Sequence, residues 1–187
     1  MMENSKTFLQ EGSIPTLEEV LYNREKRVEF IKKLLFLYPK CTIISFKLNI
    51  PGPVKNNDAL YKIFQNGLKN ISNCIQNEDL ESRYSKQLNL KTGPEYFEAV
   101  NSNYLFIKEK MTYVEENTSL GRLFDIDVLY MNNDKVQSVS RDDLNLPKRK
   151  CFVCSNDAKI CSSRRTHTIS EMHECIENIL IKDGNIL

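Results

Sequence analysis

The segment GRLFDIDVL, residues 121–129, constrains the fold more than any other part of the chain, because it places two carboxylates in an otherwise apolar strand pattern. Side chains two apart on a strand share a face, so Asp125 and Asp127 lie together, with Cα atoms about 6.6 Å apart. The alternating apolar residues then point to the opposite face, which we expect to be the core side. Like charges this close repel unless a cation, an arginine or water separates them. The pattern therefore predicts either a cation site on a sheet or an exposed edge strand with solvated acids.

Length and charge restrict the class of protein. A chain of 187 residues can bury one full core and is short for two, so we expect one domain over residues 1–187. The formal net charge is +1, with acids and bases spread along the chain, which argues against a general nucleic-acid binder. No run approaches the roughly 20 apolar residues of a membrane helix, and the N-terminus resembles no targeting segment. We expect a cytoplasmic protein that binds neither nucleic acid nor membrane.

The first third of the chain carries clear helix and strand signals. A capping box beginning at Thr16 opens a helix that ends before Pro39. Residues 42–50 are rich in β-branched side chains and predict a strand, which is followed by a rigid PGP turn. Asn57 or Asp58 can then cap a second helix.

The middle of the chain is interpreted as mainly strand. Residues 83–90 predict a strand that ends in a turn at residues 92–95, and residues 96–110 fit either a strand or a helical turn. Residues 111–115 also fit a strand, which a turn joins to the strand of Asp125 and Asp127 as its hairpin neighbour.

A further tight turn at residues 132–134 leads into a strand at residues 135–139, which completes a three-stranded meander at the centre of the protein. Thr168 and Glu171 form a second capping box and open a last helix. Together these elements predict an α+β fold: a mainly antiparallel sheet with helices packed on one side and a Cys/His knuckle near the C-terminus, at residues 148–168.

The knuckle carries four candidate metal ligands, Cys151, Cys154, Cys161 and His167, with two, six and five residues between them. Thiolate and imidazole ligands in a C-x2-C pattern suit a tetrahedral Zn²⁺, and four protein ligands would make such a site structural. The alternative is three reduced thiols beside a phosphate-binding histidine, since a reducing compartment disfavours disulfides.

Further charged residues are candidates for a phosphate site. Paired strand carboxylates that hold a divalent metal against phosphate normally recruit a third acid; Glu115 is the nearest in sequence, with Asp142 and Asp143 as alternatives. A solvent-facing role for Glu115 fits the pattern equally well. Lys55, in PGPVK, follows a strand end and precedes a helix, as in a weak phosphate cradle. The bases around the knuckle could hold a polyphosphate or an acidic partner; they are Arg141, Lys148, Arg149, Lys150, Arg164 and Arg165.

With these motifs together, the chain resembles the apo-citrate lyase phosphoribosyl-dephospho-CoA transferases, the holo-acyl-carrier-protein synthases of citrate lyase. The resemblance runs nearly end to end, and the GRLFDIDVL strand together with the cysteine knuckle is its specific part. The matching elements are REKR at residues 24–27, PGPVK at 51–55, GPE at 93–95, LGRLFDIDVL at 120–129, Ser140 with Arg141, LP-x-R-x-C-x2-C at 146–154, Cys161 and His167. The chain departs from the family at Ser162 and Ser163, where the family often has alanine and arginine, so the substrate contact of Arg164 or Arg165 is left open.

The resemblance implies a nucleotidyl-transfer reaction. A serine of the acyl carrier subunit of citrate lyase attacks the α-phosphorus of 2′-(5″-triphosphoribosyl)-3′-dephospho-CoA, and pyrophosphate leaves. Asp125 and Asp127 would hold Mg²⁺, and one of them or Glu115 would accept the serine proton. The expected substrate contacts are Lys55, Arg122, Arg141, Arg149, Arg164 and Arg165, with the basic cluster also steering an acidic carrier protein.

Two other functions are consistent with the same residues. One is a zinc-knuckle adaptor without catalysis, whose Asp-x-Asp strand is an exposed edge. The other is a nucleotidyltransferase that modifies another carrier, such as that of malonate decarboxylase, or a small molecule. Metal analysis and transfer assays on different carriers separate these alternatives.

Overall fold

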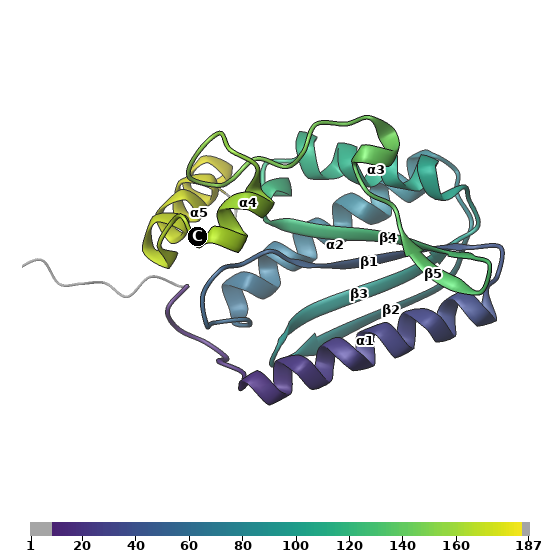
Figure 1. The fold of residues 1–187 in the computed structure, drawn as a ribbon, viewed down its shortest axis with the longest axis horizontal. Helices are drawn as coiled ribbons and strands as arrows, with labels where there is room; N and C mark the ends of the chain where they lie inside the picture. The colour runs from purple at the N-terminus through teal and green to yellow at the C-terminus, as the bar shows by residue number, and fades with distance from the viewer. Residues whose placement is uncertain (1–8, 185–187) are drawn as a thin grey trace, which may run out of the picture.

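The computed structural model describes residues 9–184 and has a five-stranded antiparallel sheet at its centre (Figure 1). The sheet order is β2-β3-β1-β4-β5, with strands β1 (Thr42–Leu48), β2 (Ser82–Leu90), β3 (Gly93–Val100), β4 (Phe124–Asn132) and β5 (Lys135–Ser138). The helices are α1 (Leu17–Leu37), α2 (Asp58–Asn77), α3 (Tyr104–Asn117), α4 (Ala158–Arg164) and α5 (Ile169–Asp183). The predicted α+β class with a mainly antiparallel sheet is confirmed. Within the described part of the chain, no helix combines the length and the apolar character needed to cross a membrane.

Helices pack on both faces of the sheet, so the expectation that they lie on one side is wrong. Alternate residues of β1 show the division: Ile43 lies in a core cluster with Leu34 of α1, whereas Ile44 lies in the larger cluster with Ile63 of α2. Helix α1 runs along one face, and α2 and α3 cover the other (Figure 1). The first five residues of β1 are buried on both faces of the sheet, as expected for a strand that helices cover on both sides.

The middle of the chain differs most from its prediction. Residues 111–115 belong to α3 and form no strand, so the expected three-stranded meander and its central hairpin are wrong. The strand beside β4 is β1, which pairs with β4 on one side and β3 on the other. The predicted turn into β5 is confirmed, because Asn132 pairs with Lys135 across a two-residue loop. Residues 93–95, expected in a turn, already belong to β3.

Three helix starts follow the sequence signals. Thr16 and Thr168 each close a capping box, with Glu19 and Glu171 respectively, and Asn57 rather than Asp58 caps α2. These side chains satisfy backbone N–H groups that no helical carbonyl reaches. Local chemistry therefore sets where these helices begin.

At the start of β4, before its pairing with β5 begins, side chains form hydrogen bonds with the backbone groups on the edge away from β1. The Ile126 N–H donates to Glu115 Oε1 at 3.2 Å, and the Ile126 carbonyl accepts from Lys108 Nζ at 3.1 Å. Arg149 donates to the Phe124 carbonyl. Buried backbone groups need such partners where no neighbouring strand supplies them. Helix α3 and the first residues of the knuckle therefore fix the start of β4, the part that carries the two aspartates.

Close backbone packing explains why the GRLFDIDVL motif begins with a glycine, Gly121. An added Cβ at this position would lie 2.3 Å from the carbonyl oxygen of Glu115 at the end of α3. No side chain fits at that distance, so only glycine lets the chain turn from α3 into β4 this closely.

Candidate functional site

Asp125 and Asp127 share the face of β4 that looks toward α1, as the alternation predicts. In the register of the sheet, Asp125 lies opposite Lys47 of β1 and Asp127 opposite Ser45. Both carboxylates are partly exposed, with side-chain exposures of 38% and 49%. The intervening Ile126 is buried in the core on the other face.

Lys47 is the functional residue that the sequence reasoning missed. Its ammonium nitrogen bonds Asp125 Oδ2 and lies 3.3 Å from Asp127 Oδ2, so the two carboxylates converge on one cation-sized position. Burial disfavours the charged form of Lys47, but the attraction of Asp127 and Asp125 outweighs it and raises the pKa of Lys47. The lysine therefore stays charged and compensates one of the two negative charges of the pair. The sequence shows that Lys47 shares a face of β1 with Ser45. Only the register between β1 and β4 shows that this face carries Asp125 and Asp127 on the neighbouring strand.

A small cavity of about 170 Å³ lies beside this cluster, and Arg27, Lys47, Lys55 and Glu95 are among its lining residues. Arg27 Nε is 3.4 Å from Glu95 Oε1. Burial raises the pKa of Glu95, although Arg27 opposes that shift, and burial lowers the pKa of Lys55, whose Nζ donates to the Ile50 carbonyl at 2.8 Å. The motifs at residues 24–27, 51–55, 93–95 and 120–129 therefore meet at one end of the sheet.

Glu115 does not join the aspartates. It lies on α3, across the sheet from them, with a side-chain exposure of 6%. Its carboxylate accepts from Arg141 at 2.9 Å and from the Ile126 N–H, and lies 3.5 Å from Arg149. The two alternative acids are also apart: Asp143 accepts from the Ser140 N–H at 2.7 Å, and both it and Asp142 lie in the exposed turn η2 (Asp142–Leu144).

The arginines predicted to bind substrate divide into two groups. Arg141 bonds Glu115 and Glu116 of α3, and Arg149 bonds the carbonyl of Phe124, so both brace the start of β4. Arg122 instead donates to the Lys150 carbonyl and lies over the ring of Phe152, 5.2 Å from its centroid.

The knuckle brings its four predicted ligands together. One ligand atom from each of Cys151, Cys154, Cys161 and His167 lies within 4.8 Å of the others. Two sulfurs bound tetrahedrally at about 2.3 Å from zinc are about 3.8 Å apart. Cys154 Sγ is 3.6 Å from Cys161 Sγ and 3.3 Å from His167 Nε2, so the donor set and its spacing fit a tetrahedral metal. Burial and the neighbouring thiols raise the pKa of Cys161 to about 11.

A larger cavity of about 500 Å³ separates the knuckle from the end of β1. Arg122, Arg149, Lys150 and Arg165 line it together with apolar residues, and so do Cys151, Cys161 and His167. Ile50 lines both this cavity and the smaller one beside Lys47. The two cavities are therefore neighbours across the segment that follows β1.

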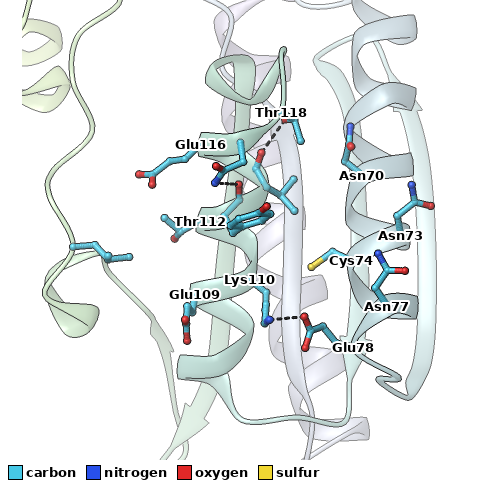
Figure 2. A pocket seen from close by; sticks show the side chains of 14 residues that line it. Asn70, Asn73, Cys74, Asn77, Glu78, Glu109, Lys110, Thr112, Glu116 and Thr118 are labelled. Carbon is cyan, nitrogen blue, oxygen red and sulfur yellow. Dashed lines mark hydrogen bonds and ion pairs between the residues drawn. The ribbon is translucent and has the colours of Figure 1, made fainter.

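A third cavity, of about 630 Å³, lies between α2 and α3 (Figure 2). Asn70, Asn73 and Asn77 of α2 lie on one side of it, and Lys110 of α3 reaches across toward Glu78. Among the described residues that line it, none is a site residue predicted from the sequence. This cavity is separate from the aspartates and from the knuckle.

Comparison with known proteins agrees with the motifs that meet in these sites. The model of the family "Apo-citrate lyase phosphoribosyl-dephospho-CoA transferase" matches residues 15–183. A protein of Streptococcus pyogenes serotype M18 named "Probable apo-citrate lyase phosphoribosyl-dephospho-CoA transferase" is 34% identical over 90% of this chain and 87% of its own length. A Vibrio cholerae serotype O1 protein of the same name is 30% identical over 88% of this chain and 90% of its own.

A Leuconostoc mesenteroides protein named CitXG is 33% identical over 92% of this chain, and the match spans 36% of that longer protein. The family match covers α1 through α5, including both aspartates and the whole knuckle. The chain belongs to the apo-citrate lyase phosphoribosyl-dephospho-CoA transferase family.

Proposed function

We propose that this protein transfers the phosphoribosyl-dephospho-CoA group from its triphosphate precursor to a serine of the apo-acyl carrier subunit of citrate lyase. The observation that carries the proposal is the convergence of Asp125 and Asp127 on one cation position, within the part of the chain that the family model matches. Transfer of a phosphoryl or nucleotidyl group depends mainly on positioning and charge neutralisation, which such a site supplies.

In the reaction, the serine oxygen forms a bond to the α-phosphorus while the bond from that phosphorus to the pyrophosphate oxygen breaks. The serine proton passes to Asp125 or Asp127, whose carboxylates are partly exposed on the open part of the sheet face. Pyrophosphate leaves with its negative charge compensated by Lys47, Arg27 and Lys55, which line the adjoining cavity. Glu115 is a poor base for this step because two arginines and a backbone N–H occupy its carboxylate.

Asp125 and Asp127 are the residues that would hold Mg²⁺. The fit rests on the ammonium group of Lys47, which occupies a position where carboxylate oxygens from both residues converge. A bound Mg²⁺ would neutralise charge on the triphosphate. Lys47 lines the adjoining cavity and would compensate phosphate charge there.

We assign Arg141 and Arg149 mainly to positioning β4, whereas Arg122 and Arg165 face the larger cavity. Lys148 and Arg164, at the exposed edge of the knuckle, remain available to steer an acidic carrier protein. The whole chain would act as one transferase domain. We assign the protein to the cytoplasm, a compartment that keeps the cysteine thiols of proteins reduced and available for metal binding.

The assay for the proposal mixes the protein with apo-carrier, triphosphate precursor and Mg²⁺. We expect the carrier mass to rise by that of one phosphoribosyl-dephospho-CoA group, with one pyrophosphate released per carrier. A carrier whose acceptor serine is replaced by alanine is the control. Zinc binding without any transfer to the citrate lyase carrier would support the adaptor function instead, and transfer only to another carrier would redirect the substrate assignment.

We further propose that the four knuckle ligands bind one structural Zn²⁺. We expect the purified protein to contain about one zinc per chain by elemental analysis, because the thiol and imidazole donors are already preorganised. Cys154→Ser should lose most of this zinc, since Cys154 contacts both Cys161 and His167. Cys175→Ser, on α5 and outside the cluster, is the matched control and should keep it. Full zinc content in Cys154→Ser would disprove this ligand set.

A further inference from the structure

The cavity between the knuckle and β1 has a one-sided charge. Arg122, Arg149, Lys150 and Arg165 line it, and no aspartate or glutamate is among its described lining residues. Arg149 is paired with the carboxylate of Glu115 at 3.5 Å, so Arg122, Lys150 and Arg165 are the bases that give this wall its positive charge. Such a wall favours an anionic ligand over a neutral or cationic one. Guanidinium groups match phosphate oxygens particularly well, because they donate two parallel hydrogen bonds.

The same cavity has an apolar part. Ile50, Ile169 and Met172 line it together with Phe152, whose ring carries the guanidinium of Arg122 at 5.2 Å. A flat heteroaromatic ring can stack in such a place against aromatic and guanidinium planes. The volume of about 500 Å³ lies within the range of about 300–1,000 Å³ that is typical of small-ligand sites.

The arrangement of the two cavities limits which part of a substrate each can hold. Lys47, which bonds Asp125, lines the small cavity, whose volume of about 170 Å³ admits only groups of modest size. The larger cavity adjoins it, since Ile50 lines both. An extended ligand can therefore place its reacting phosphates at the small cavity and a bulkier nucleoside phosphate in the large one.

We propose that the cavity lined by Arg122, Phe152, Arg165 and Met172 binds the adenosine diphosphate part of the substrate, with the ring on the apolar wall and the phosphates on the arginines. This inference deepens the proposed function, because the dephospho-CoA part of the substrate contains an adenosine diphosphate. It also distinguishes the two adjacent arginines at the end of α4. Arg165 lines the cavity, whereas Arg164 is not among the described residues that do.

Calorimetric titration with 3′-dephospho-CoA and with ADP tests the proposal without the transfer reaction. We expect wild-type protein, with its metal content measured, to bind both ligands, and to bind inorganic pyrophosphate at least tenfold more weakly than ADP. Arg165→Met should weaken dephospho-CoA at least tenfold, as expected when one hydrogen-bonded charge pair is lost. Arg165→Lys should lose less because it keeps the charge.

Arg164→Met is the matched control and should bind dephospho-CoA as wild type does. Both arginines are exposed, so thermal unfolding should be unchanged in either variant. Absence of binding to wild type, or equal losses in Arg164→Met and Arg165→Met, would overturn the proposal. Pyrophosphate binding that is as tight as ADP binding, and that Arg165→Met weakens to the same extent, would remove the base from the cavity.

The outcome is distinguishable from a failure of the proposed function. Asp127→Asn lies outside this cavity and should bind dephospho-CoA within about twofold of wild type, whether or not it transfers the group. If wild type binds dephospho-CoA through Arg165 but modifies no citrate lyase carrier, the ligand site stands and the acceptor assignment fails.

Discussion

Asp127→Asn is expected to lower the turnover number of carrier modification at least about a hundredfold, the scale on which a lost electrostatic contact to the transition state acts. The substitution keeps the shape of the side chain but removes half of the charge that converges on the Lys47 position. Because the side chain is 49% exposed, the free energy of unfolding should change by less than about 1 kcal/mol. Single-turnover transfer to apo-carrier, with urea unfolding of the same preparation, measures both effects.

Asp134→Asn is the matched control for this substitution. Asp134 lies in the exposed turn of the same β4–β5 hairpin with φ of 59°, a conformation that asparagine also adopts readily. Its turnover should equal that of wild type. A folded Asp127→Asn protein with normal turnover at saturating Mg²⁺ would remove this carboxylate from the reaction.

Glu115→Ala is expected to lower the free energy of unfolding by about 3 kcal/mol, as found when one partner of a buried ion pair is removed. The truncation leaves the Ile126 N–H without its acceptor and takes the carboxylate from Arg141 and Arg149, whose side chains are 14% and 20% exposed. Urea denaturation measures the change. Turnover, corrected for the folded fraction, should fall far less than in Asp127→Asn, because Glu115 positions β4 and does not touch the reacting groups.

Two variants separate the contributions at this position. Glu115→Gln keeps an acceptor for Ile126 and should lose less stability than Glu115→Ala. Glu116→Ala removes the neighbouring contact of Arg141, but Glu116 is 48% exposed, so the loss should be under about 1 kcal/mol. Full stability of Glu115→Ala combined with loss of turnover would restore Glu115 as a candidate base.

Local signals in the sequence predicted the elements that local chemistry determines. The capping boxes at Thr16 and Thr168 and the tight turn before Lys135 each lie within a few residues, and all three are confirmed. The five residues 111–115 are too few to distinguish the hydrophobic repeat of a helix from the alternation of a strand. Their β-branched and aromatic side chains favoured a strand. The signal for α3 was the apolar spacing of Ile107, Met111 and Val114 after the cap at Asn103.

The parts of the candidate site that could be predicted from the sequence are those whose residues are close to one another in the chain. The shared face of Asp125 and Asp127 follows from strand alternation alone, and the knuckle ligands lie within 17 residues, so both groups could be assembled without a structure. Lys47 is 78 residues from Asp125 and joins it only through the register of β1 against β4. The misassigned strand at residues 111–115 made Glu115 look like a neighbour of the aspartates, whereas in α3 it lies behind them.

The capped outer edge of β4 affects how a protein substrate can approach Asp125. Glu115, Lys108 and Arg149 already occupy the backbone groups that an incoming strand would need. A carrier polypeptide therefore cannot extend the sheet at this point by β-augmentation, one of the common ways in which domains recognise peptides. Under the proposed function, the carrier has to present its serine from above the sheet face, on a loop or at a helix end. Recognition should then depend on the folded shape of the carrier more than on the sequence around the serine.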